Sequence, residues 1–229
     1  MPIARLQPWV LFGGVLLAFL AGIINATGFL GVQHQGITHL TGTTTMLGIA
    51  VAERDFTNIG HFALLIGAFM AGCAASGAII RDATLRLGRR YGVVLAVEAM
   101  LLLAAVPLLD GGNLAGEYLA SAACGLQNAM ASTYSGAVLR TTHFSGTLTD
   151  LGIFIGHRLR GLPVDGRRVR LLTSLVVSFA LGAVAGTLLF GIWRYRALYV
   201  PAVATGFAGA AYGIYRHWRL RAELRGKSS

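Results

Sequence analysis

Residues 38–49, THLTGTTTMLGI, recur as residues 142–153, THFSGTLTDLGI, in a chain that otherwise consists largely of apolar runs. A self-match of this length is hard to attribute to composition and indicates a duplication. Weaker matches flank it: GIINA at 22–26 resembles GLQNA at 125–129, and an F-x-x-G pattern at 69–72 returns at 179–182. Matching polar interruptions in two halves of an apolar chain are typical of a transport site.

The composition is that of an integral membrane protein. Of the 229 residues, 55% are hydrophobic and only 12% are charged, which is too little charge for a soluble domain of this length. The net charge of +10 collects in short stretches between apolar runs, as in cytoplasmic loops, so we expect no nucleic-acid binding. Cys73 and Cys124 lie inside apolar segments without metal-ligand spacing, so we expect no metal site and no cofactor.

Six apolar runs each approach the ~20 residues that a helix needs to cross a bilayer. They cover residues 8–32, 60–80, 91–109, 114–139, 171–193 and 197–216. Basic residues gather at 81–90, at 157–170 and in the tail after 216, and we expect these stretches and both chain ends in the cytoplasm. The connections at 53–59, 110–117 and 194–196 carry few or no basic residues, which places them outside.

Two shorter apolar pieces, 41–52 and 145–157, contain about 12 residues each, or about 18 Å of helix. A full crossing by 41–52 would move the basic stretch at 81–90 to the outside, so the charge pattern favours re-entrant half-helices. The predicted fold is an all-α integral membrane protein with six transmembrane helices and two re-entrant half-helices. An eight-span alternative stays open, because short tilted spans exist.

Each half of the predicted fold contains three crossings. Residues 1–110 form the first unit and residues 111–229 the second. Because three is an odd number, the two units insert in opposite orientations. The result is a 3+3 inverted repeat with its pseudo-two-fold axis in the membrane plane.

Each copy of the repeated motif combines a hydroxyl side chain with a glycine at the start of a half-helix. The hydroxyl is suited to cap the helix N-terminus, and the glycine lets the backbone turn or approach a ligand closely. We expect both N-termini to meet near the midplane, where unpaired N–H groups and the helix dipole favour a neutral polar or anionic solute. The residues are Thr41 or Thr43 with Gly42, and Ser145 or Thr147 with Gly146.

Two histidines, His39 and His143, precede these hydroxyls in register. An imidazole can donate to a ligand or change its charge near neutral pH, although a buried histidine is usually structural. The amides of Asn25, Gln127 and Asn128 lie within predicted spans. They fit either ligand binding or hydrogen bonding to broken backbone and neighbouring helices, and both roles can coexist.

Ionisable residues inside apolar runs are costly and therefore informative. Glu98 lies within the run at 91–109, and Asp150 occupies the second motif where the first has Met46. Either carboxylate is a candidate for carrying a coupling proton. An interhelical ion pair, with a partner such as Arg140, is the alternative role.

The signatures GLQNA at 125–129 and RTTHFSGTLTDLG at 140–152 resemble those of the YoaK family of bacterial inner-membrane proteins, long catalogued as a domain of unknown function. The resemblance covers nearly the whole chain and implies an inner-membrane location and small-molecule transport, without identifying a substrate. The first signature departs from the family: Asn25 stands where the family commonly has Asp, and Thr43 ends a triplet that is commonly Thr-Gly-Asn. These departures bear on selectivity or ion coupling.

The leading interpretation is a transporter or channel in contact with the lipid bilayer, and the sequence does not separate a channel from a carrier. A second is an assembly or sensor subunit that binds another membrane protein through its small-residue helix faces, which could also form a homodimer. A third is an intramembrane enzyme using His143 with Asp150 or Glu98. Because known catalytic motifs such as HExxH are missing, we expect no enzyme.

Overall fold

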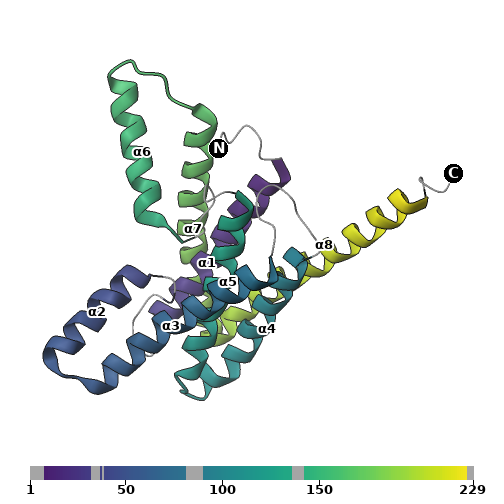
Figure 1. The fold of residues 1–229 in the computed structure, drawn as a ribbon. Helices are drawn as coiled ribbons and strands as arrows, with labels where there is room; N and C mark the ends of the chain where they lie inside the picture. Colours follow the sequence, from purple (N-terminus) through teal and green to yellow (C-terminus); the bar gives the residue numbers. More distant parts are fainter. Residues whose placement is uncertain (1–7, 32–36, 38, 81–89, 136–141, 226–229) are drawn as a thin grey trace.

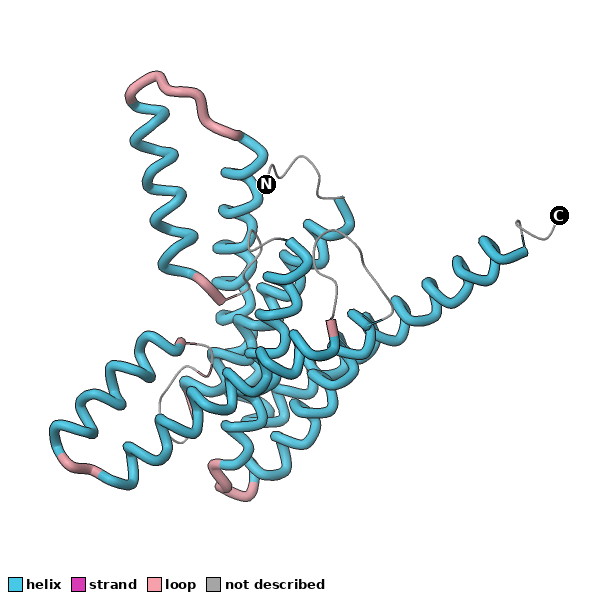
Figure 2. The backbone as a smooth tube through the Cα atoms, in the orientation of Figure 1, coloured by secondary structure: helices cyan, strands magenta, loops and turns pink. Residues whose placement is uncertain are grey.

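The computed structural model describes residues 8–31, 37, 39–80, 90–135 and 142–225, and these residues form helices joined by short connections (Figures 1 and 2). Within the described residues, each predicted span and each shorter piece contains a helix. The helices are α1 (Pro8–Phe29), α2 (Leu40–Glu53), α3 (Phe56–Ile79), α4 (Arg90–Asp110), α5 (Ala115–Ser135), α6 (Phe144–Leu159), α7 (Gly166–Trp193) and α8 (Tyr199–Arg225), with a short 3-10 helix η2 (Arg194–Leu198) between α7 and α8.

Among the described residues, four stretches are long and apolar enough to cross a membrane: Leu11–Phe29, Phe56–Ile79, Arg90–Asp110 and Gly166–Ile214. The last stretch has 49 residues, and at 1.5 Å per residue a straight helix of that length would be about 74 Å long, more than twice the hydrocarbon thickness. The helix is interrupted at Arg194, whose φ of 53° lies in the left-handed region. These stretches make the chain a multi-pass membrane protein.

Small residues bring the long helices together. α1 packs along α7, α3 along α5, and α4 along both α5 and α8. A Cβ atom on Gly22 of α1 would collide with the carbonyl oxygen of Phe179 in α7, and one on Gly125 of α5 would collide with that of Phe69 in α3. Such contacts need glycine, because any larger residue would force the backbones apart.

The two short helices lie outside the bundle as arms of helical hairpins, α2 against α3 and α6 against α7 (Figure 1). At the tip of the first hairpin the Asp55 side chain caps α3 by accepting a hydrogen bond from the Asn58 N–H at 3.1 Å, and this bond lowers the pKa of Asp55. At the second, Asp165 caps α7 by accepting from the N–H groups of Arg167 and Arg168. Among the described residues of α6, none is buried.

Candidate functional site

A carboxylate and an amide meet in the interior of the bundle. The side-chain amide nitrogen of Gln127 on α5 donates to Oε1 of Glu98 on α4 at 2.9 Å. Glu98 is 0% exposed and Gln127 1%. Glu98 Oε2 and Gln127 Oε1 have no hydrogen-bond partner among the described residues. Buried polar atoms are normally paired, so this pair has unused capacity to bind a proton, a water molecule or a polar ligand.

The predicted amides divide between α5 and α1. Asn128 follows Gln127 on α5, and its Oδ1 also has no hydrogen-bond partner within the described part of the chain. Asn25 is 7% exposed on α1, a helix that contacts α5. The structure therefore brings the predicted proton-coupling residue Glu98 together with the predicted ligand residue Gln127, and it buries Asn25 in the same bundle.

The predicted hydroxyl caps are wrong. α2 and α6 begin one residue after His39 and His143, so the histidines occupy the N-cap positions, and neither makes a side-chain capping bond. The hydroxyls lie in the first helical turn and donate backwards instead: Thr43 Oγ1 to the His39 carbonyl at 3.3 Å, and Thr147 Oγ1 to the His143 carbonyl at 2.9 Å. A threonine inside a helix commonly bonds the carbonyl four residues earlier. Thr41 and Ser145 likewise lie inside the first turn, not at the caps.

The glycines of the two motifs have different surroundings. The His143 imidazole lies against Gly146, where a Cβ atom would collide with ring atoms Nε2 and Cδ2. At Gly42 the equivalent space is open among the described residues. Gly146 therefore allows a histidine to fold over the first turn of α6, whereas the first motif lacks this contact.

Asp150 forms an ion pair between α6 and α7. Its Oδ2 accepts a hydrogen bond from Arg168 Nη2 at 2.8 Å, and the two side chains are 38% and 46% exposed. The Arg168 guanidinium also lies over the Phe154 ring, 5.4 Å from its centroid. An interhelical partner is therefore present, although the partner suggested from the sequence, Arg140, lies outside the described residues. An exposed pair of this kind contributes at most about 1 kcal/mol to stability.

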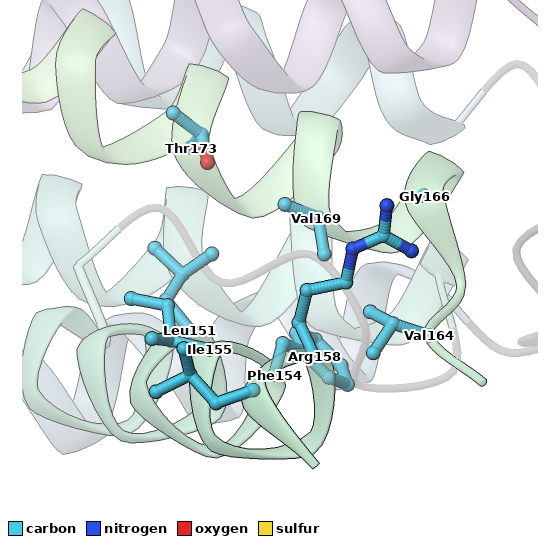
Figure 3. A pocket seen from close by; sticks show the side chains of 9 residues that line it. Leu151, Phe154, Ile155, Arg158, Val164, Gly166, Val169 and Thr173 are labelled. Carbon is cyan, nitrogen blue, oxygen red and sulfur yellow. The ribbon is translucent and has the colours of Figure 1, made fainter. Parts of the chain in front are cut away.

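A groove of about 620 Å³ runs between α6 and α7 (Figure 3). Its lining is apolar except for Arg158 and Thr173, and it includes none of the predicted binding residues. The remaining lining residues are Leu151, Phe154, Ile155, Leu159, Val164, Gly166 and Val169. An open apolar groove offers a polar solute few hydrogen-bond partners.

Sequence reasoning missed a second buried polar cluster, which joins α3 to α5. His61 Nδ1 lies 3.1 Å from the Tyr118 hydroxyl, and His61 Nε2 lies 3.5 Å from Glu117 Oε2. His61 is 4% exposed and Glu117 5%. Both residues lie inside predicted spans, where burying an ionisable group is costly. The reasoning that singled out Glu98 could therefore also have singled out these two residues.

The comparisons with known proteins identify a family. Residues 13–211 match the family model described as "Protein of unknown function (DUF1275)". The chain belongs to the DUF1275 family. DUF1275 is the YoaK-like family, so the resemblance seen in the signatures is confirmed. No curated protein and no solved structure matches this DUF1275 chain.

Proposed function

We propose that this DUF1275 protein is a small-molecule membrane transporter or channel with a central polar site. The observation that carries the proposal is the fully buried Glu98–Gln127 pair, whose two remaining oxygen atoms have no hydrogen-bond partner in the described residues. Intramembrane polar groups are retained against their cost mainly where they handle a solute, an ion or a proton. Glu98 then serves as the proton-coupling carboxylate, whereas the exposed pairing of Asp150 with Arg168 gives Asp150 a structural role.

Reciprocal helix contacts support an inverted repeat around this site. The sequence duplication relates α1 to α5 and α3 to α7. Under that relation, the contact of Gly22 on α1 with Phe179 on α7 is the counterpart of the contact of Gly125 on α5 with Phe69 on α3. In each of these two contacts, a helix of the first half packs against a helix of the second half through an equivalent glycine. A pseudo-two-fold axis requires such matching contacts.

The short helices fit re-entrant segments that lead to the central site. α2 and α6 have 14 and 16 residues, or about 21 and 24 Å of helix, which is less than the ~30 Å hydrocarbon core. Phe144, the first residue of α6, packs on Phe179 with ring centroids 4.9 Å apart, and the Phe179 backbone contacts Gly22, three residues before Asn25. The start of α6 is thereby tied to the part of α1 that carries the buried amide.

The substrate class follows from these groups. Helix N-termini offer unpaired N–H donors and a positive dipole end, and Gln127 and Asn128 offer amide donors and acceptors. A neutral polar or small anionic solute satisfies all of them. A bulky apolar substrate would leave them unpaired at high cost.

The test is flux of a panel of small polar solutes and anions into proteoliposomes containing the full chain. We expect at least one solute to enter, and we expect Glu98→Gln, which keeps the shape of the side chain, to change the rate by tenfold or more. Asp150→Asn is the matched control, because it removes a carboxylate on the bundle's exterior and should leave the rate within about twofold. Correctly folded and inserted protein that passes no solute in the panel would contradict the proposal.

The exposed apolar face of α6 favours one other role, that of a subunit that binds a membrane partner. Ile153, Ile155 and Leu159 are 48%, 64% and 83% exposed. Lipid contact explains this face equally well in a membrane protein. Co-purification of a stoichiometric partner, lost on Ile155→Arg, would favour the subunit role over transport.

A further inference from the structure

The geometry points to a second site in this protein: the buried His61–Glu117 pair binds one exchangeable proton. His61 Nε2 faces Glu117 Oε2 at 3.5 Å without a hydrogen bond between them, and the Tyr118 hydroxyl lies 3.1 Å from the other ring nitrogen, Nδ1. The pair is separate from Glu98–Gln127 and was not among the residues expected to carry protons.

Apolar side chains pack beside the pair. Phe62 and Leu65 of α3 form a buried cluster with Ala50 of α2, and Tyr118, Leu47 and Ile59 pack against this cluster. The His61 ring also packs at 5.4 Å from Phe62, measured between ring centroids. In this setting the state of the pair with no net charge is strongly favoured over one with an unbalanced charge.

The other charged residues at this end of the bundle are engaged or exposed. Asp55 accepts hydrogen bonds from Asn58, and Asp110 pairs with Arg196 at 3.3 Å. The neighbouring charges of the α2–α3 turn, Glu53 and Arg54, are exposed. Among the described residues, the charge of His61 is therefore balanced by Glu117 alone.

The protons of this cluster can be counted. When the Tyr118 hydroxyl donates to Nδ1, the neutral imidazole carries its proton on Nε2 and points it at an ionised Glu117, for a net charge of −1. One further proton, taken from water, restores neutrality if it binds the carboxyl group or if it binds Nδ1, in which case the Tyr118 hydroxyl accepts from Nδ1 instead of donating to it. The two groups therefore titrate as one coupled unit. Tyr118 is only half-buried, so the cluster lies one side chain from the surface.

The position of the pair suits proton exchange with the side opposite the basic loops. His61 lies in the second turn of α3, and Glu117 lies in the first turn of α5, next to the connections that the charge pattern places outside. The same buried face of α5 carries Ser121 one turn further on. Gln127 lies ten residues beyond Glu117, or about 15 Å along the helix, which is too far for direct proton transfer. As a coupling site for solute movement the pair rests on the proposed transport function, but its proton binding does not.

The proton site can be tested without any transport assay. The full-length protein in lipid nanodiscs is titrated from about pH 4 to pH 9, a range that brackets the ordinary pKa values of Glu and His. Infrared spectroscopy follows the carboxylic acid C=O stretch. We expect a titrating carboxyl band that is absent in Glu117→Gln and retained in Glu98→Gln, which serves as the matched control for a second buried carboxyl group.

The histidine variant supplies the independent measurement. His61→Asn should shift the midpoint of the Glu117 band by about tenfold or more in proton concentration, the size expected when a partner within ~4–6 Å is removed. This readout decides the matter even where Glu117→Gln fails to fold, and Tyr118→Phe, which removes only a hydroxyl group, should shift the midpoint in a third folded variant. Survival in Glu117→Gln of the band that Glu98→Gln retains, or a midpoint of this band that neither His61→Asn nor Tyr118→Phe moves, would overturn the proposal.

Flux measurements separate this inference from the proposed function. If solute flux exists and its pH dependence shifts in His61→Asn, the pair is a coupling site. Flux whose pH dependence is unchanged in His61→Asn would overturn the coupling role. If no flux is found but the Glu117 band titrates as expected, transport fails and the proton site stands.

Discussion

Replacing Gly125 by alanine should destabilise the bundle, because the new methyl group has no room. Its Cβ would collide with the carbonyl oxygen of Phe69 and lie 2.9 Å from the Phe69 carbonyl carbon and 3.1 Å from its Cα. These are backbone atoms, so no rotamer change relieves the contact and α3 must move away from α5. Overpacking costs about 1–3 kcal/mol, whereas the higher helix propensity of alanine stabilises the helix by about 1 kcal/mol. We therefore expect the free energy of unfolding to fall by up to about 2 kcal/mol.

The matched control is Gly67→Ala on α3, where a Cβ meets nothing within 4 Å among the described residues. It gains the same propensity without the clash, so the two variants should differ by about 1–3 kcal/mol in free energy of unfolding. Circular dichroism during unfolding of the detergent-solubilised protein by added SDS measures this difference. Equal stability of Gly125→Ala and Gly67→Ala would refute the close contact.

The proposed inverted repeat adds a second expectation to this experiment. Gly22 on α1 makes the counterpart contact with Phe179, so Gly22→Ala should also lose up to about 2 kcal/mol of stability. Because the two sites lie on different helix pairs, their effects should add in the double variant. Strongly unequal losses would argue against equivalent contacts in the two halves.

Two further variants test the motif region. Gly146→Ala should displace the His143 ring, because a Cβ there collides with the imidazole, and the ring's NMR resonances should shift; Gly42→Ala has open space and should leave the His39 resonances in place. Asp150→Asn should lower the free energy of unfolding by less than about 1 kcal/mol, since its pair with Arg168 is exposed, and this small loss should vanish in high salt. An Asp150→Asn loss of several kcal/mol would mean that the pair is shielded from solvent.

The sequence was most informative about where helices lie. Apolar length alone predicted α1, α3 and α4 to within a few residues, because a membrane helix must bury its whole backbone and side-chain surface in lipid or protein. The family signature at 140–152 was equally readable, since it depends on residue order and not on packing. The starts of α2 and α6 were misplaced because a hydroxyl inside a helix and one at its cap look the same in sequence, and only the backbone path distinguishes them.

The sequence did not predict which helices pack against each other or which side chains meet between them. Glu98 was recognised as a costly buried carboxylate, but its partner Gln127 was assigned to the ligand instead, because hydropathy does not fix how each helix is rotated about its axis. His61 and Glu117, 56 positions apart, meet only because α3 packs along α5. Such contacts follow from the close glycine-mediated packing of long helices, which no single-helix pattern encodes.

We propose that the two repeated motifs open onto one aqueous site, and cysteine accessibility tests this arrangement most directly. In a background with Cys73→Ala and Cys124→Ala, the variants Thr41→Cys and Ser145→Cys are exposed to a membrane-impermeant thiol reagent from each side of oriented vesicles. We predict that both positions react and that a solute from the polar and anionic panel slows both reactions. Complete protection of both positions from both sides, with no effect of any solute, would contradict a shared site and leave the motifs as packing elements.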